Sequence, residues 1–195
     1  MPTGVAIRDP RQQLFEAAER VLLRAGPTAL TSRAVTEEAG VAKGVLHRHF
    51  KDFDDFLTEL VRDRIDRLAS RGESLRAAAG TATVADNLTG ALMDVFDTVG
   101  VAVVSLVIAR DELRARLRAL GPPGIPLMGE AARMLAAYLA AERDLGRVTD
   151  DADVDVLAPT LLGAAHLLFA DRESPAPDTA SVHRVVTTVV SGAVR

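Results

Sequence analysis

The sequence has 195 residues, 48% of them hydrophobic and 26% charged, which is the composition of an ordinary globular protein rather than of a disordered one. The absence of cysteine excludes disulfides, thiolate metal sites and a cysteine nucleophile. The longest apolar run, residues 99–109, is well short of the ~20 residues of a membrane span, and residues 1–10 lack a signal-peptide pattern. We therefore expect a soluble, cytoplasmic protein with no membrane partner.

The net charge of −4 is unevenly distributed along the chain. Residues 1–52 carry eight basic and six acidic side chains, a net +2, whereas the remainder carries 15 basic and 21 acidic ones, a net −6. Both lysines of the chain, Lys43 and Lys51, lie in the basic segment. Because nucleic-acid binding depends on local charge, this small basic head is compatible with DNA binding despite the acidic total.

Apolar residues recur with helical spacing along almost the whole chain, and strand alternation is nearly absent. The first predicted helix covers residues 10–25 and ends at a Gly-Pro pair. A short second helix, capped by Thr31, ends at Gly40. A turn at residues 40–42 then leads to a short third helix. We expect these three helices to form a compact head.

The third helix places Leu46 and Phe50 on its inner side. Asp52 can cap a long fourth helix that extends to about residue 79. The rest of the chain predicts two or three helices over 84–120, then helices over 127–143, 156–169 and 178–193, with loops at 121–126 and 174–177. The predicted fold is all-α with about nine helices: a head at residues 1–52 and a helical bundle at residues 53–195.

Two short helices around a tight turn, within residues 30–57, form a helix-turn-helix pattern, in which the second helix enters the major groove of DNA. With Leu46 and Phe50 inward, the helical wheel points Gly44, Val45 and Arg48 outward. The side chains expected at the flanks of this face are Lys43, His47 and His49. Gly44 allows close approach of the backbone, and Val45 can contact a thymine methyl group.

Polar side chains of this face can donate hydrogen bonds to phosphates or base edges. We expect Arg48 and Lys51 to bind phosphates and Arg33, in the second helix, to make a bidentate contact with guanine. His47 and His49 are not expected to bind one metal ion, because two residues on a helix are roughly 200° apart around its axis. No metal or cofactor site and no catalytic motif is expected, so we do not predict an enzyme.

The segment Ala-Gly-Val-Ala-Lys-Gly-Val-Leu-His-Arg-His-Phe, residues 39–50, closely resembles the recognition motif of the TetR family of transcriptional regulators, and the resemblance covers residues 11–60. It implies a regulator that binds an operator in double-stranded DNA. The DNA contacts that it implies come from Thr31, Ser32, Arg33, Lys43, Gly44, Val45, His47 and His49. It also implies a homodimer formed by the last two helices, residues 154–170 and 178–193.

Three residues depart from the family pattern. Ala42 replaces the serine that caps the recognition helix, His47 replaces a tyrosine that contacts a phosphate, and Phe53 replaces a lysine. Loss of the cap costs about 1 kcal/mol of helix stability. These departures predict weaker anchoring to DNA but leave the predicted fold unchanged.

The last predicted helix carries a stripe of valines that we expect to be buried in a two-fold dimer interface: Val182, Val185, Val186, Val189 and Val190. The apolar body between residues 84 and 169 predicts, in addition, a site for a small, mostly apolar effector that releases the DNA. Candidate lining residues, each also compatible with a plain core position, are Met93, Phe96, Met128, Met134, Tyr138, His166 and Phe169. The alternative is a dimeric helical ligand carrier or interaction module with weakened DNA binding.

Overall fold

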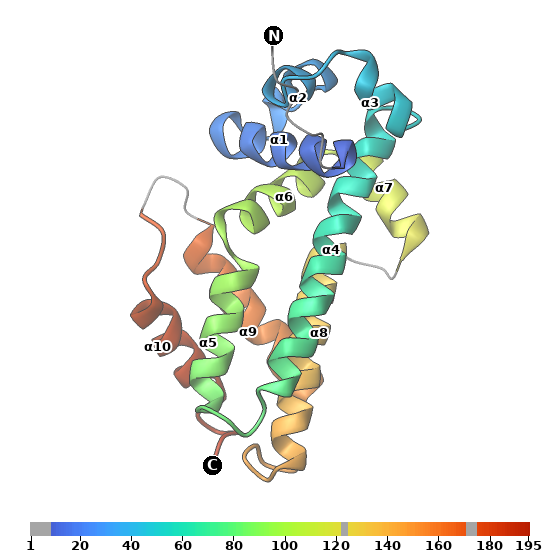
Figure 1. Ribbon diagram of the computed structural model, residues 1–195. Coiled ribbons are helices and arrows are strands. Elements are labelled where there is room, and N and C mark those ends of the chain that lie inside the picture. The colour runs from blue at the N-terminus through green and yellow to red at the C-terminus, as the bar shows by residue number, and fades with distance from the viewer. Residues whose placement is uncertain (1–8, 122–124, 171–174) are drawn as a thin grey trace. The chain divides into compact units, whose positions relative to one another are not determined.

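The computed structural model describes residues 9–121, 125–170 and 175–195 (Figure 1). Within these ranges the protein is all-α, as predicted, with ten α-helices, one short 3₁₀ helix and no β-strand. Arg8 and parts of the two loops predicted at residues 121–126 and 174–177 lie outside the described residues.

The helices follow the predicted order closely. Residues 84–120 form three helices, and the long helix that was expected to reach residue 79 ends at Ala77. The elements are α1 (Pro10–Ala25), η1 (Pro27–Ala29), α2 (Ser32–Glu38), α3 (Gly44–His49), α4 (Phe53–Ala77), α5 (Val84–Val95), α6 (Thr98–Ala109), α7 (Asp111–Leu120), α8 (Pro126–Asp144), α9 (Val154–Phe169) and α10 (Thr179–Val190).

The helices group into two compact units. The first contains residues 1–63 and 102–121, and the second contains residues 64–101 and 122–195. Helices α4 and α6 therefore each contribute residues to both units. The boundary predicted after residue 52 falls inside the first unit, and the distant segment 102–121 belongs to the same unit as the three-helix head.

The first unit is organised around one apolar core, to which α1, α2, α3 and the start of α4 each contribute one face (Figure 1). Side chains at helical spacing in α1 are almost fully buried, and Val35 of α2 and Leu46 of α3 are inserted beside them. Several of these side chains are 0% exposed, among them Leu14, Leu22, Val35, Leu46, Phe56 and Leu60. This core leaves the opposite sides of α2 and α3 in solvent.

The second unit packs α9 against α8 and α10, and α10 against α5 (Figure 1). Two helix starts are capped by aspartates that accept backbone N–H groups, Asp153 at α9 and Asp178 at α10. Hydrogen bonds to Ser181, from its side chain and its backbone, hold the pKa of Asp178 below its usual value. Pro159 lies inside α9, which continues through it.

The valine stripe of α10 has a different role from the one predicted. Val182, Val186 and Val190 are at most 3% exposed within one chain, and Val185 and Val189 are half-buried. Helix α10 packs against α5 and α9 of the same chain, as expected for an amphipathic helix that buries its apolar face within its own unit. The stripe therefore cannot serve as the argument for a dimer.

No single helix in the described ranges is long and apolar enough to cross a membrane. The pair α5 and α6 reaches the required length and composition only when both helices are counted together across a bend.

Candidate nucleic-acid interface

Helix α2 is held against α1 by side chains from the latter. Gln13 Nε2 donates to the Ala39 carbonyl at 2.9 Å, at the end of α2. Arg20 and Arg24 both donate to the Glu38 carboxylate, each at 2.8 Å. These two guanidinium groups hold the pKa of Glu38 below its usual value. The position of α2 is thus set by α1 at its last turn.

The turn between α2 and α3 depends on glycine. Gly40 has a φ of +67°, in the left-handed region that side chains disfavour. The Val41 N–H then donates to the Thr36 carbonyl at 3.0 Å and closes the turn. This geometry confirms the tight turn predicted at residues 40–42.

Helix α3 starts without a side-chain cap. Lys43, the residue before the helix, already has helical angles and makes no side-chain capping hydrogen bond. The methyl group of Ala42 cannot accept a hydrogen bond from the first N–H groups, although its carbonyl accepts the Val45 N–H at 2.9 Å. The loss of capping predicted from Ala42 is therefore present in the structure.

The inner side of α3 is fixed by aromatic packing. Leu46 is 0% and Phe50 3% exposed. The Phe50 ring lies 5.7 Å from Phe15 and 5.0 Å from Phe56, centroid to centroid. Arg11 adds two contacts, with its guanidinium carbon 4.5 Å from the Phe50 centroid and Nη1 donating to the His49 carbonyl at 3.3 Å. Helix α3 is consequently held at its C-terminal end.

The outer side of α3 is free of packing. Lys43, Gly44, His47, Arg48 and His49 are exposed, whereas Val45 is half-buried. No atom lies within 4 Å of the position that a Gly44 side chain would take, so the backbone is open to a large partner there. Gly44 and Arg48 are exposed as the wheel predicts, whereas Val45, also predicted to point outward, is half-buried. The DNA contacts of these residues remain a prediction.

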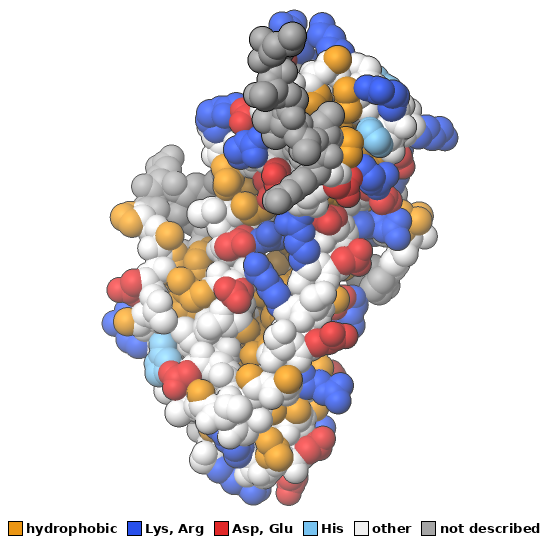
Figure 2. All heavy atoms as spheres, in the orientation of Figure 1, with side chains coloured by type: hydrophobic (Ala, Val, Ile, Leu, Met, Phe, Trp, Pro, Cys, Tyr) orange, Lys and Arg blue, Asp and Glu red, His pale blue; other side chains and the backbone are white. Residues whose placement is uncertain are grey.

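The positive charges of the head separate into two groups. Arg11, Arg20, Arg24 and Arg33 each form an ion pair with a carboxylate. By contrast, the structure gives no hydrogen bond or ion pair among the described residues for the side chains of Lys43, Arg48 and Lys51. The pKa of Asp52 is lowered chiefly by the hydrogen bond from the Asp55 N–H, and the nearby Lys51 charge adds to this effect. Figure 2 shows blue and pale blue side chains together at the edge of the head where Figure 1 places α3.

The predicted contacts at α2 have different surroundings. Thr31 caps the helix as expected, accepting the Ala34 N–H at 3.1 Å, and Ser32 is half-buried. Arg33 is exposed, but its Nε donates to Glu37 at 2.7 Å. The pair with Glu37 uses Nε alone, so the guanidinium is oriented by Glu37 without engaging its Nη groups.

Arg11 and Gln13, which help to position α3 and α2, were not predicted from the sequence. Both precede the recognition motif by more than twenty residues, and their partners are backbone carbonyls. Any residue type offers a backbone carbonyl, so the sequence carries no signal for such contacts.

Phe53, one of the three departures from the family pattern, is half-buried and stacks on Phe56, with the ring centroids 5.6 Å apart. The residue thus extends the aromatic core at the start of α4.

The second unit contains cavities between α4, α5 and α8. One, of about 310 Å³, is lined by apolar side chains of Leu68, Leu75, Ala91 and Met134 and by polar side chains of Arg71, Ser74, Asp86, Asn87 and Asp94. A more open one, of about 700 Å³, lies between α4 and α8. Met134 borders both cavities, so one predicted ligand residue lies where a small molecule could bind.

The other predicted ligand residues lie elsewhere. Met93 and Met128 are half-buried. Phe96, His166 and Phe169 form a separate cluster of rings, with Phe96 stacked on Phe169 at 5.2 Å and 5.7 Å from His166. Tyr138 is fully buried beside the smaller cavity's Asn87. Their role in ligand binding stays a prediction.

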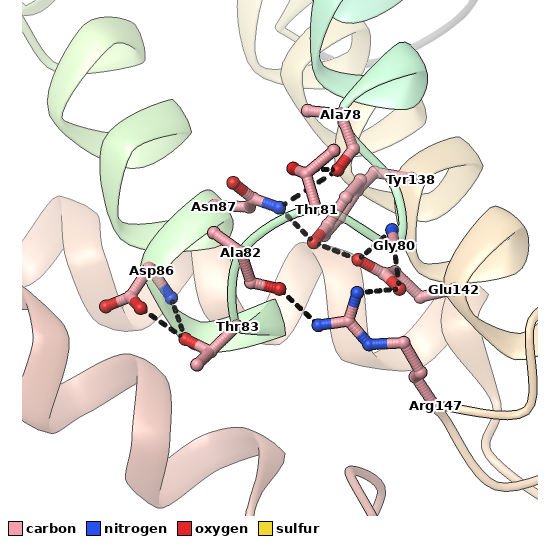
Figure 3. A network of polar contacts seen from close by, with 10 residues as sticks. All are labelled: Ala78, Gly80, Thr81, Ala82, Thr83, Asp86, Asn87, Tyr138, Glu142 and Arg147. Carbon is pink, nitrogen blue, oxygen red and sulfur yellow. Dashed lines mark hydrogen bonds and ion pairs between the residues drawn. The ribbon is translucent and has the colours of Figure 1, made fainter.

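Tyr138 belongs to a buried polar network, shown in Figure 3. Its hydroxyl donates to Glu142 at 2.5 Å and accepts from Asn87 at 3.0 Å. Glu142, which is 0% exposed, also accepts the Gly80 N–H at 3.3 Å and pairs with Arg147 at 3.3 Å. Burial, reinforced by the Glu142 carboxylate, raises the pKa of Tyr138. The network ties the turn between α4 and α5 to α8.

Among the described residues, no group of three or more His, Cys, Asp or Glu side chains could hold a metal ion. The geometry of the first unit is instead that of a helix-turn-helix DNA-binding protein. Residues 14–60 match the family model of the bacterial regulatory proteins of the tetR family. In this segment the chain is therefore similar to the TetR-family regulators.

Two relatives illustrate the similarity at the sequence level. The chain is 29% identical over 104 residues to the HTH-type transcriptional repressor KstR2 of Mycolicibacterium smegmatis, a match that covers 53% of this chain and 50% of KstR2. It is 33% identical over 78 residues to the HTH-type transcriptional regulator PksA of Bacillus subtilis, over 36% of this chain and 38% of PksA. The matched part of the chain thus spans about half the length of KstR2 and a smaller share of the length of PksA.

Solved structures share the fold over nearly the whole chain. FadR of Bacillus subtilis, in complex with stearoyl-CoA, has a TM-score of 0.71 and 20% identity, covering 93% of this chain and 98% of FadR. A transcriptional regulator of Rhodococcus has a TM-score of 0.71 and 21% identity, over 95% and 98% of the two chains. The multidrug binding protein EbrR, complexed with imidazole, has a TM-score of 0.62 and 24% identity, over 93% and 95%.

Proposed function

We propose that the protein is a dimeric transcriptional repressor that binds a palindromic operator through α2 and α3 and is released by a small molecule. The observation that carries this proposal is the separation of charges in the first unit. In the head, within described residues 9–52, four arginines are paired with carboxylates, while Lys43, Arg48 and Lys51 lie on or next to the exposed side of α3. Cations without a protein partner are suited to phosphates.

A second support is the rigidity of α3. A recognition helix discriminates between bases only if its outer face is held at a defined angle by its inner face. Leu46, Phe50 and the Arg11 contacts supply this anchoring. KstR2, which is named a repressor, is similar to the chain in a segment of 104 residues.

The effector is inferred from the cavities of the second unit. The smaller cavity is lined by both apolar and polar side chains, which suits a molecule with an apolar body and at least one polar group. FadR binds stearoyl-CoA and has the same fold. A ligand that binds one conformation of this unit better than another would shift the population away from the DNA-binding state.

Dimer formation is inferred from α9 rather than from the valines of α10. Val156 is 58% and Leu167 76% exposed, and Pro159 and Gly163 are exposed between them at helical spacing. An apolar stripe of this kind on a surface helix is typical of a helix–helix interface. In a two-fold dimer, two heads would meet half-sites about 34 Å apart on the DNA.

The decisive experiment titrates labelled random-sequence duplex DNA with the protein at increasing salt. A repressor should bind at low salt and lose affinity linearly on a logarithmic scale as salt rises. Failure to bind at about 50 mM salt would refute the proposal and favour the ligand carrier or interaction module. Sedimentation at micromolar concentration tests the dimer, and a monomer alone would contradict it.

Thermal-shift measurements with named probes test the effector. Stearoyl-CoA and short apolar amines or acids should raise the melting temperature if they bind the folded second unit. Stabilisation only by highly charged, fully polar compounds would contradict an effector with an apolar body. We further propose a cytoplasmic location, where such a regulator meets its DNA, and no enzymatic activity.

A further inference from the structure

The junction of α6 and α7 belongs to the same compact unit as the DNA-binding head. Arg110 lies at this junction, between the last residue of α6 and the first residue of α7. Its side chain is half-buried and is directed to the segment that precedes α2. The residue is about eighty positions away from that segment in sequence.

The contacts of Arg110 are with backbone atoms of the head. Its Nη2 donates to the Leu30 carbonyl at 2.7 Å and reaches the Pro27 carbonyl at 3.5 Å. Its guanidinium carbon lies 5.7 Å from the centroid of the Phe53 ring, at the start of α4. One arginine thereby touches both ends of the helix-turn-helix segment.

Leu30 is a sensitive point of the head. Its side chain is 0% exposed, and the next residue, Thr31, caps α2. A hydrogen bond from a charged donor is stronger than one from a neutral donor, and partial burial strengthens it further. Fixing the Leu30 carbonyl therefore fixes the direction in which the chain enters α2.

Arg116, one and a half turns further along α7, makes a parallel connection. Its guanidinium lies 3.3 Å from Asp52 and 3.7 Å from Asp54. Asp52 caps α4 by accepting the Asp55 N–H at 2.7 Å. The α7 segment thus holds the chain just before α2 and just after α3.

We propose that Arg110 is a positioning residue for DNA recognition: it sets the orientation of α2, and with it the angle at which Thr31 to Arg33 meet the DNA. The inference rests on the proposed DNA-binding function. Arg110 need not touch DNA itself. Helix α6, which Arg110 directly follows, contributes residues to both units.

The test compares Arg110→Ala and Arg110→Lys with a matched control, Arg114→Ala. Arg114 lies on the same segment, but its contacts are with Asp111 and the Ile108 carbonyl, both outside the helix-turn-helix. Each variant is assayed against a duplex selected in vitro by the wild-type protein and against a random duplex. Amide hydrogen exchange across residues 31–39 supplies a readout that does not depend on DNA.

Arg110→Ala should lower the preference for the selected duplex about tenfold, which corresponds to ~1.4 kcal/mol, while affinity for random DNA stays within about twofold. Exchange at the amides of α2 should accelerate. Arg110→Lys, which keeps one donor but loses the planar fork, should restore part of the preference. Arg114→Ala should behave as wild type.

Two results would overturn the proposal: unchanged preference and exchange in Arg110→Ala, or equal losses for selected and random DNA that follow a lowered melting temperature. If the wild-type protein selects no duplex, the proposed function fails. Faster exchange in α2 of Arg110→Ala, with no change in Arg114→Ala, would still support the positioning role, and unchanged exchange would refute it.

Discussion

Replacing Lys43 and His47 together by alanine should abolish specific operator binding without unfolding the head. Both side chains are exposed and lie away from Leu46 and Phe50, which anchor α3. Substitutions at such surface positions usually change the free energy of unfolding by no more than about 0.5 kcal/mol. The melting temperature should therefore remain near that of the wild type.

The effect on DNA binding can be calculated from charge. Each phosphate contact adds about 0.9 to the slope of log affinity against log salt, so loss of Lys43 from both half-sites lowers the slope by about 1.8. When salt rises from about 50 to about 200 mM, the wild type should therefore lose roughly 12 times more of its affinity than the double variant. Loss of the His47 donor removes a further hydrogen bond, independent of salt.

Fluorescence anisotropy with a labelled operator duplex measures both quantities. Arg24→Ala is the matched control, because it removes one positive charge from the same unit, but one that is paired with Glu38 on the α1 side. The control should keep the wild-type slope. If the double variant binds as tightly as wild type and with the same salt slope, α3 does not contact the DNA through these residues and the assignment of the interface is wrong.

Four further substitutions or conditions give separable outcomes. Arg33→Ala should relax sequence preference by about 1–3 kcal/mol in competition assays, with little loss of stability, since its pair with Glu37 is exposed; an unchanged preference would exclude a guanine contact. Ala42→Ser should supply the missing cap and raise the unfolding free energy by about 1 kcal/mol in urea titrations, and no gain would mean that the cap is not limiting. Because the pKa of Glu38 is lowered in the folded protein, its contribution to stability is present above the ordinary pKa of 4.5 and is lost as pH falls below that value. The difference in unfolding free energy between wild type and Glu38→Gln should therefore narrow on acidification. A difference that stays constant with pH would contradict this. Glu142→Ala, which leaves the Arg147 charge and the Gly80 N–H without their partner, should cost about 3–5 kcal/mol by denaturant unfolding, and a loss under about 1 kcal/mol would show that water replaces the carboxylate.

The fold and the interface differ in how much of them the sequence determines. Helical spacing, capping residues and glycines are local signals, so the order of the helices and the turn at Gly40 could be predicted. The inward position of Leu46 and Phe50 follows from the helical period and is confirmed by their burial. Helix ends were less accurate, as in α4, because fraying and capping shift them by one or two residues.

Long-range contacts could not be predicted in the same way. The segment 102–121 joins the head through Arg110 and Arg116, and the partner of Arg110 is a carbonyl that any residue would offer. The valines of α10 satisfied the pattern of an apolar interface, but a pattern cannot tell whether the covering surface belongs to the same chain. Here α10 packs on α5 and α9 of the same chain, and three of the five valines are buried within that chain.

The buried carboxylate of Glu142 also determines the register in which α8 packs. This helix is rich in alanine, with six between residues 131 and 141, and small, uniform side chains allow a helix to slide or rotate by one position at little cost. A carboxylate that must meet the Gly80 N–H, the Tyr138 hydroxyl and Arg147 together accepts one register only. Every other placement would leave a charge in an apolar interior. The alanines give α8 its close packing, and one acidic residue makes that packing unique, with Met134 beside the cavity as a result.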